Sequence, residues 1–308
     1  IAEGLPILRD SSFKAYINIM YGCNNFCSYC IVPYVRGRER SRKADDILRE
    51  ADMLVKDGVK EITLLGQNVN SFGNDSGEIS FPQLLKRLDQ TGIQRLRFMT
   101  SHPKDLSDEL TLAYASLKSL APHLHLPIQS GSDRMLKAMN RGYTVESYLE
   151  KAAKLRRALP AIGLTTDLIV AFPGETEEDF SDTLELARLM RYDSAFTFIY
   201  SKRAGTRAAE LSGEVSKEAA TERIERLIAL QEGITKETLA SLKGERMGIL
   251  VEGVSARRES QMSGKCGRNI SVNFTGGDEG MIGQIVPVKI NGAGSNTLRG
   301  EYEKEQIT

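Results

Sequence analysis

Short apolar runs alternate with stretches of helical periodicity along most of the 308 residues, and no other feature constrains the fold as strongly. The apolar runs have the composition of strands and lie at 14–22, 61–69, 95–101, 123–128, 163–172 and 194–201. Helical patterns follow at 45–58, 81–92, 106–120, 144–159 and 177–190. Alternating strands and helices predict a parallel α/β sheet with right-handed crossovers. Six such units predict an open, partial β/α barrel, because a closed barrel of this kind needs eight.

The composition changes after a long helical pattern at 216–243. The tail has short alternating runs at 246–254, 268–274 and 283–290, broken by Gly, Asn and Ser, which predict a small antiparallel β-barrel. A prior of about 150 residues per domain also favours two domains. We therefore expect a partial barrel at 13–242 and a small barrel at 243–308.

Charge and hydrophobicity exclude several classes of protein. Hydrophobic residues make up 41% of the chain, which excludes wholesale disorder. Lys+Arg and Asp+Glu both number 41, so a nucleic acid would have to be held by a local patch. No stretch approaches the roughly 18 apolar residues of a membrane span, and the first residues lack the pattern of a secretory signal. We expect a soluble, cytoplasmic protein without a membrane partner.

Three of the four cysteines form a C-x3-C-x2-C run at Cys23, Cys27 and Cys30. Thiolates on one short loop are typical ligands of an iron–sulfur cluster. Three ligands instead of four would leave one metal corner for a substrate or cofactor. The alternative is a structural zinc site completed by a His or by Cys266, although no second ligand pair occurs elsewhere. We expect Cys266 to be a packed small side chain or an incidental thiol.

Polar and unusual residues follow every predicted strand. Ligands of parallel β/α sheets bind at the carboxyl ends of the strands, so these residues predict one shared site. They are Cys23, residues 66–68, 101–103, 129–132, 173–175 and 202–203.

The run 22–42 resembles the signature of radical S-adenosylmethionine (SAM) enzymes, in its methylthiotransferase form. Further segments that resemble this family lie at 64–73, 100–110, 123–144, 165–180 and 192–209. The tail resembles the TRAM RNA-binding barrel. The resemblance implies that Cys23, Cys27 and Cys30 hold a 4Fe-4S cluster whose fourth iron binds SAM. Reductive cleavage of SAM would then give a 5′-deoxyadenosyl radical.

Within the family, residues 66–70 are most similar to the branch that adds a methylthio group to the 2-position of isopentenyl-adenosine next to the tRNA anticodon. Other branches act on threonylcarbamoyl-adenosine or on an aspartate of a ribosomal protein. The resemblance implies a tRNA anticodon stem-loop and a low-potential electron donor as partners, and we expect a monomer. Family members carry a second cluster in an N-terminal domain that this sequence lacks, so residues 1–12 are expected to be a remnant of the linker. A non-catalytic, zinc-containing RNA-binding module remains the alternative from a different class.

The resemblance also suggests cofactor-binding residues. Tyr29 is expected over the SAM adenine, or else packs the loop. Gln67, Gln129, Ser130 and Ser132 would bind the ribose, amine or carboxylate of SAM, or else serve ordinary turns. Arg203 would pair with the SAM carboxylate, or else form a surface ion pair.

Two basic stretches are candidate RNA contacts, with a merely solvated surface as the alternative in each case. The first lies beside the cysteines and comprises Arg36, Arg38, Arg40, Arg42 and Lys43. The second lies in the tail and comprises Arg257, Arg258, Lys265 and Arg268. We expect Asp167 to line the site wall, and His102 and His125 to be satisfied core histidines.

Overall fold

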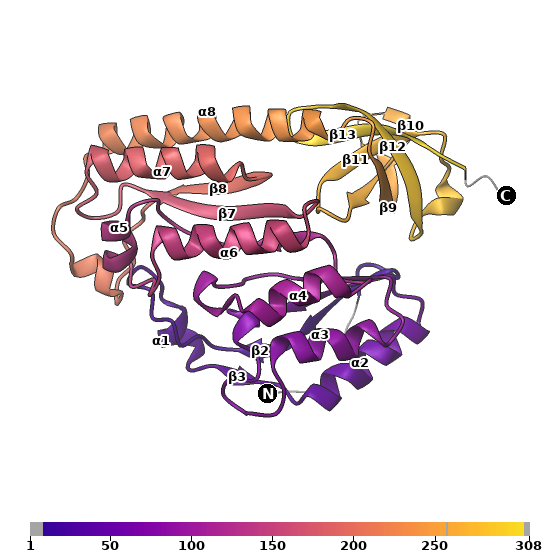
Figure 1. Ribbon diagram of the computed structural model, residues 1–308, viewed down its shortest axis with the longest axis horizontal. Coiled ribbons are helices and arrows are strands. Elements are labelled where there is room, and N and C mark those ends of the chain that lie inside the picture. The colour runs from indigo at the N-terminus through magenta and orange to yellow at the C-terminus, as the bar shows by residue number, and fades with distance from the viewer. Residues whose placement is uncertain (1–8, 257, 305–308) are drawn as a thin grey trace.

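A computed structural model describes residues 9–256 and 258–304, and its larger unit is built from two parallel three-stranded sheets (Figure 1). The first sheet has the order β1 (Lys14–Asn18), β4 (Glu61–Leu65), β5 (Arg95–Phe98). The second has the order β6 (His123–His125), β7 (Gly163–Val170), β8 (Ser194–Ile199). An isolated parallel bridge joins Leu96 of β5 to Leu120, which lies shortly before β6. The predicted partial barrel of six β/α units is confirmed.

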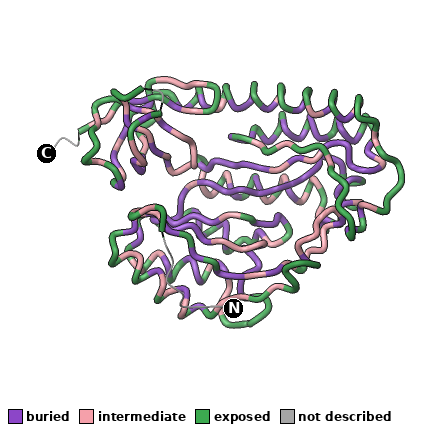
Figure 2. Tube along the Cα trace, turned by 180° about the vertical axis from the view of Figure 1, so that it is seen from behind, coloured by how far each residue is buried: buried purple, intermediate pink, exposed green. Residues whose placement is uncertain are grey.

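Helices cover the outer face of these sheets, and strands β4, β5 and β6 are buried along almost their whole length (Figure 2). Polar caps begin several of them: Ser107, Ser132, Thr144, Thr176 and Ser216 each accept a hydrogen bond from the first turn. The helices are α1 (Val32–Arg36), α2 (Ala44–Lys56), α3 (Phe81–Asp89), α4 (Asp108–Ser116), α5 (Asp133–Ala138), α6 (Val145–Ala158), α7 (Glu177–Met190) and α8 (Lys217–Ser241). Among the described residues, none of these helices combines the length and the apolar character that crossing a bilayer requires.

The inner face of the arc stays open between its first and last strands. Tyr16 on β1 is 62% exposed, and Phe196 and Phe198 on β8 are 57% and 51% exposed. Tyr16 and Phe196 each lie between buried or half-buried neighbours, and Phe198 is two residues further along β8, so all three point to the inside of the arc. An incomplete barrel therefore presents aromatic side chains at both edges of its opening.

The tail folds into the predicted small barrel. Its strands are β9 (Arg246–Ser255), β10 (Arg258–Cys266), β11 (Ser271–Thr275), β12 (Ile285–Ala293) and β13 (Thr297–Tyr302). They close in the order β10-β11-β13-β12-β9 around a core that includes Val251, Val272 and Phe274. The pairing of β11 with β13 is parallel, which corrects the expectation of a purely antiparallel barrel. Parallel neighbours arise here because a longer connection, which includes β12, separates them in sequence.

The small barrel lies against the amino ends of the strands of the partial barrel. Arg95 and Arg97 at the start of β5 are buried, and both contact the carboxylate of Glu61, at 3.5 and 2.9 Å. Their remaining donors reach carbonyl oxygens of the small barrel, including those of Lys265 and Cys266 at 3.0 and 2.7 Å. Two buried guanidinium groups thus join the two units by direct hydrogen bonds.

Helix α8 is shared between the two units. It packs along β8, and its last turn contributes Leu239 to the core of the small barrel, followed by Leu242. Figure 1 shows it running along the larger unit to the small barrel. The boundary between residues 242 and 243 remains a prediction. Leu239 and Leu242 already belong to the core of the small barrel, so packing does not change at that point.

Replacing Arg97 by Ala should destabilise the chain by about 3–5 kcal/mol, because it removes one partner of a buried ion pair and leaves two carbonyl groups without their donor. The free energy of unfolding from a urea titration measures this loss. The matched control is Arg246→Ala, whose exposed pair with Glu303 contributes less than about 1 kcal/mol. Equal stabilities for the two variants would contradict the proposed link between the units.

Candidate active site

The cysteine loop is fixed at both ends of its run. Before it, β2 (Met20–Tyr21) pairs with β3 (Arg40–Ser41), which returns the chain beside the loop. Gly22 has a φ of +74°, and a Cβ there would lie 2.0 Å from the carbonyl oxygen of Arg38, so only glycine fits this turn. The amide of Gly22 donates to Gln67 Oε1 at 2.7 Å, and that of Cys23 donates to Gly37 at 3.1 Å. The loop is therefore held by the end of β4 as well as by its own hairpin.

The three thiols are free and lie half-buried on this loop. Burial raises the pKa of Cys23 and of Cys30, and the nearby charge of Cys27 raises both further. In the described part of the chain, no three His, Cys, Asp or Glu side chains converge on a point that would hold a single metal ion. A 4Fe-4S cluster makes a different demand, because each thiolate binds a separate iron corner. Three neighbouring thiols on one loop fit that demand.

Arg141 is a site residue that the sequence analysis missed. It follows α5, is 5% exposed, and donates through Nη1 to Cys27 Sγ at 3.2 Å and to the hydroxyl of Tyr29 at 3.3 Å. Its other donors reach the hydroxyl of Tyr143 at 2.7 Å and the carbonyl of Pro127 at 2.8 Å. The guanidinium also lies 5.3 Å from the centre of the Tyr143 ring. One buried cation thus connects the cysteine loop to the carboxyl end of β6.

Tyr29 lies on the inner side of the loop. Its ring packs against an apolar cluster that contains Met135, Met139 and Phe172. Burial raises the pKa of Tyr29 well above its usual value, so the phenol is neutral at physiological pH. This packing matches the alternative in which Tyr29 orders the loop, and a contact with SAM remains a prediction.

Gln67 and Gln129 both lie at strand ends, as predicted. Gln67 uses its carbonyl oxygen to hold Gly22, as described above. Gln129 is buried and adopts a left-handed φ of +81°, while its backbone continues the pairing with β7 through Asp167 and Ile169. Each residue thus has a structural task, and SAM binding by either remains a prediction.

Ser130 and Ser132 are buried and have partners within the protein. Ser132 caps α5 and donates to Asp179 Oδ1 at 2.6 Å, and Ser130 shares a hydrogen bond with Thr183 at 3.3 Å. These contacts match ordinary turn and cap chemistry. Direct contact of these hydroxyls with SAM stays untested.

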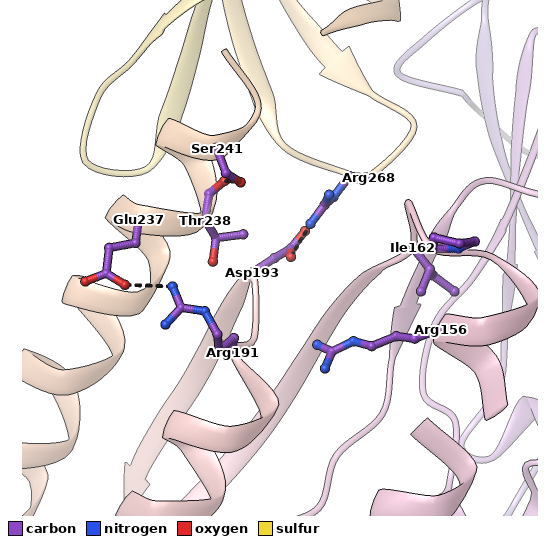
Figure 3. A pocket seen from close by; sticks show the side chains of 9 residues that line it. Arg156, Ile162, Arg191, Asp193, Glu237, Thr238, Ser241 and Arg268 are labelled. Carbon is purple, nitrogen blue, oxygen red and sulfur yellow. Dashed lines mark hydrogen bonds and ion pairs between the residues drawn. The ribbon is translucent and has the colours of Figure 1, made fainter. Parts of the chain in front are cut away.

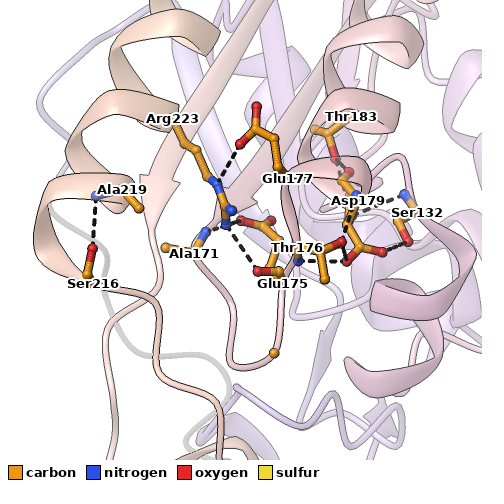
Figure 4. A network of polar contacts seen from close by, with 12 residues as sticks. Ser132, Ala171, Glu175, Thr176, Glu177, Asp179, Thr183, Ser216, Ala219 and Arg223 are labelled. Carbon is orange, nitrogen blue, oxygen red and sulfur yellow. Dashed lines mark hydrogen bonds and ion pairs between the residues drawn. The ribbon is translucent and has the colours of Figure 1, made fainter.

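A polar network extends from Ser132 to α8 (Figure 4). Asp179 accepts hydrogen bonds from Ser132, Thr176 and Arg134; although burial alone would raise its pKa, these bonds hold the pKa below its usual value. Glu175 receives Arg223 of α8 at 2.8 Å and the amide of Ala171 at 2.7 Å. The network fixes the loop after β7 to the helix that leads to the small barrel.

Ala171 has a φ of +58° in that loop. A left-handed conformation costs an alanine roughly 1–2 kcal/mol. The hydrogen bond from its amide to buried Glu175 offsets part of this strain.

The predicted basic residues fall into two separate groups. Arg36, Arg38 and Arg40 are exposed around the cysteine loop, and Arg203 is exposed close enough for its charge to lower the pKa of Cys30, against the larger effect of burial. Arg42 is different, because it pairs with Glu50 and donates to the carbonyl of Asn18. The described residues of the second group, Arg258, Lys265 and Arg268, lie in the small barrel, at the far end of the molecule from the cysteine loop (Figure 1).

Within the small barrel, Arg258 is exposed and begins β10, while Arg257 lies outside the described residues. Lys265 contacts Asn269 at 3.4 Å. Arg268 pairs with buried Asp193 at 2.9 Å, beside a cavity of about 280 Å³ at the junction of the two units (Figure 3). This pair gives Arg268 a role in joining the units, and its contact with RNA stays a prediction.

His102 and His125 are both predicted to be core histidines with satisfied hydrogen bonds, and only one of them is fully satisfied. His125 is buried and satisfied, because its Nδ1 lies 3.0 Å from the hydroxyl of Thr165 and its Nε2 lies 3.5 Å from Asp167. His102 is buried too, but only its Nδ1 is paired, with the amide of Lys104, and its Nε2 has no partner among the described residues. His102 is therefore a buried histidine that is only half satisfied. Asp167 is half-buried on β7, in register with Phe196 of β8, and its place in the site wall remains a prediction.

Two family descriptions match this chain. The Radical SAM superfamily covers residues 17–187, and the TRAM domain covers residues 240–302. The chain belongs to the radical SAM superfamily. The three half-buried thiols lie within the matched range, and their role as ligands of a cluster remains a prediction.

Curated relatives agree with the resemblance seen in the sequence. A protein of Thermoanaerobacter sp. (strain X514) is 54% identical over 303 residues, which cover 98% of this chain and 64% of the relative. A protein of Carboxydothermus hydrogenoformans is 52% identical, covering 94% of this chain and 66% of the relative. Both are named tRNA-2-methylthio-N(6)-dimethylallyladenosine synthase. The chain therefore spans about two thirds of the length of these relatives, and the predicted resemblance is confirmed.

Solved structures support the fold of the larger unit. Coproporphyrinogen III oxidase (HemN) from Escherichia coli gives a TM-score of 0.53 at 15% identity, covering 74% of this chain and 54% of that chain. The radical SAM methyltransferase TsrM from Kitasatospora setae also gives 0.53 at 15% identity, covering 63% of this chain and 38% of that chain. At this identity the two structures bear on the fold alone.

Stability should fall as pH falls below about 6.5, because burial lowers the pKa of His102 to about 2 and that of His123 to about 3. The unfolded chain binds these protons and the folded chain does not, so each histidine contributes stability above pH 6.5 that is lost toward pH 3. Urea titrations between pH 7 and pH 5 should show a loss of up to about 1.4 kcal/mol per pH unit for each histidine. His123→Gln should have a shallower slope, and a slope equal to that of the wild type would contradict this account.

Proposed function

We propose that this chain is the SAM-cleaving and RNA-binding part of an enzyme that attaches a methylthio group to the 2-position of an isopentenylated adenosine next to the tRNA anticodon. One observation carries the proposal: three half-buried thiols share a fixed loop at the carboxyl ends of a partial barrel. The named activity of relatives that are 50–54% identical supports the choice of substrate.

Cys23, Cys27 and Cys30 would hold a 4Fe-4S cluster. When bound, the cluster and SAM supply the electron transfer and the 5′-deoxyadenosyl radical that removes a hydrogen atom from the substrate. The chain's own residues orient and shield this chemistry. Gln67 holds the loop, Tyr29 covers its inner side, and exposed Arg203 is available to the SAM carboxylate.

The remaining assignments concern binding. Gln129, Ser130 and Ser132 would line the SAM site. The exposed Arg36, Arg38 and Arg40 would contact RNA phosphates beside the loop, while Arg257, Arg258, Lys265 and Arg268 would act from the small barrel.

The larger assembly is part of the same proposal. A second cluster would belong to the N-terminal domain of the complete protein, and a low-potential donor would supply the electron. The enzyme would act as a monomer in the cytoplasm. Residues 13–242 would form the radical SAM unit and residues 243–308 the RNA-binding unit, with 1–12 as linker.

The function is tested in a strain that lacks the gene, complemented with the full-length protein. The wild type should restore the 2-methylthio nucleoside in tRNA digests analysed by mass spectrometry. Cys27→Ala should not restore it, and isopentenyl-adenosine should accumulate instead, because one cluster ligand is lost.

The matched control is Cys266→Ala, which removes the fourth cysteine from the core of the small barrel, away from the loop. This variant should restore the nucleoside and keep the iron content of the purified protein. If the methylthio nucleoside persists in the deletion strain while a modified ribosomal-protein aspartate disappears, the tRNA substrate is wrong. One zinc per chain and no iron after anaerobic reconstitution would reject the enzyme itself.

A further inference from the structure

Arg141 carries a charge in a place where charges are costly. Its side chain is 5% exposed, and its donors reach three structural partners and one thiol. A buried guanidinium without a counter-charge is strongly unfavourable. The groups around Arg141 therefore have to include an anion.

The described residues offer Arg141 only one such group. No carboxylate in the described ranges forms an ion pair with it, in contrast to the buried Arg97 and Arg223. Its other hydrogen-bond partners are the hydroxyls of Tyr29 and Tyr143 and the carbonyl of Pro127, and a phenol is ordinarily neutral at physiological pH. The thiol of Cys27, at 3.2 Å, is the remaining acid in contact.

We propose that Arg141 is the counter-charge of the iron–sulfur cluster and that it raises the reduction potential of this cluster. The inference rests on the proposed function, because it requires a cluster on Cys27. Hydrogen bonds to a ligating sulfur and nearby positive charge both stabilise the more negative, reduced state of a cluster. In this step one electron enters the cluster from a low-potential donor, and no proton moves to or from Arg141.

The shape of arginine explains how the charge is held. Nε of Arg141 donates to the hydroxyl of Tyr143, and Nη2 donates to the carbonyl of Pro127. These two hydrogen bonds fix the planar guanidinium in the orientation that directs Nη1 toward the sulfur of Cys27. Tyr143 is itself held by carbonyl groups of the segment after β6, at 3.0 Å from Ile128. Arg141 is thus a positioning and tuning residue, since it acts on the cluster through Cys27.

The test compares full-length wild type with Arg141→Met, Arg141→Lys and Lys137→Met after anaerobic reconstitution. Lys137 is the matched control, because it is an exposed cation on the neighbouring helix α5. Electron paramagnetic resonance at fixed solution potentials measures the ratio of reduced to oxidised cluster on Cys23, Cys27 and Cys30, taken from the signal that a Cys27→Ala variant lacks. Iron and sulfide analysis measures how much cluster each variant holds.

Arg141→Met should lower the ratio of reduced to oxidised cluster at least tenfold at one fixed potential, which corresponds to about 59 mV for one electron. Lys137→Met should stay within twofold of the wild type, since water screens its charge. An Arg141→Met ratio within twofold of the wild type would overturn the inference and leave the proposed function intact.

If Arg141→Met assembles no cluster on the three cysteines, the Arg141→Lys variant shows whether the charge or the packing of Arg141 matters. A lysine variant that holds the cluster with a ratio within threefold of the wild type supports the inference, because it keeps the charge and loses the fork. A lysine variant that also lacks the cluster overturns it, because packing rather than charge would then be the contribution of Arg141. A wild type without any cluster would overturn the proposed function itself.

Discussion

Three thiols on one short loop act together only if that loop is held in place, and much of the fold serves this requirement. The left-handed turn at Gly22, the side chain of Gln67 and the pairing of β2 with β3 fix its backbone. Arg141 then brings a buried positive charge to the sulfur of Cys27. The strands supply the rigid frame, because their carboxyl ends present the loop, Gln67 and the segment after β6 on one side.

The opposite side of the frame is closed by the small barrel. Arg95, Arg97 and Glu61 join the two units where the strands begin, and Arg268 with Asp193 adds a second link. Helix α8 has 25 residues, so it spans about 37 Å, and Arg223 ties its first part to the loop after β7. Helix α8 thus links the loop after β7 to the small barrel.

Periodicity was sufficient to predict the six β/α units, and spacing was sufficient to single out the cysteines. Strands β10 and β13 escaped prediction because their sequences are polar and contain few apolar residues in alternation. Arg141 escaped because burial of a single arginine in a loop leaves no local pattern. Ser132 and Arg268 have partners 47 and 75 residues away, so their structural roles follow from tertiary contacts that the sequence does not display.

The central claim is that three protein sulfurs hold the cluster and that SAM binds its remaining iron. Electron–nuclear double resonance of the reduced protein with SAM labelled at the amino nitrogen and the carboxylate tests this claim most directly. The account predicts coupling of both labels to the cluster. Absence of coupling, together with a fourth protein ligand on the cluster, would contradict it.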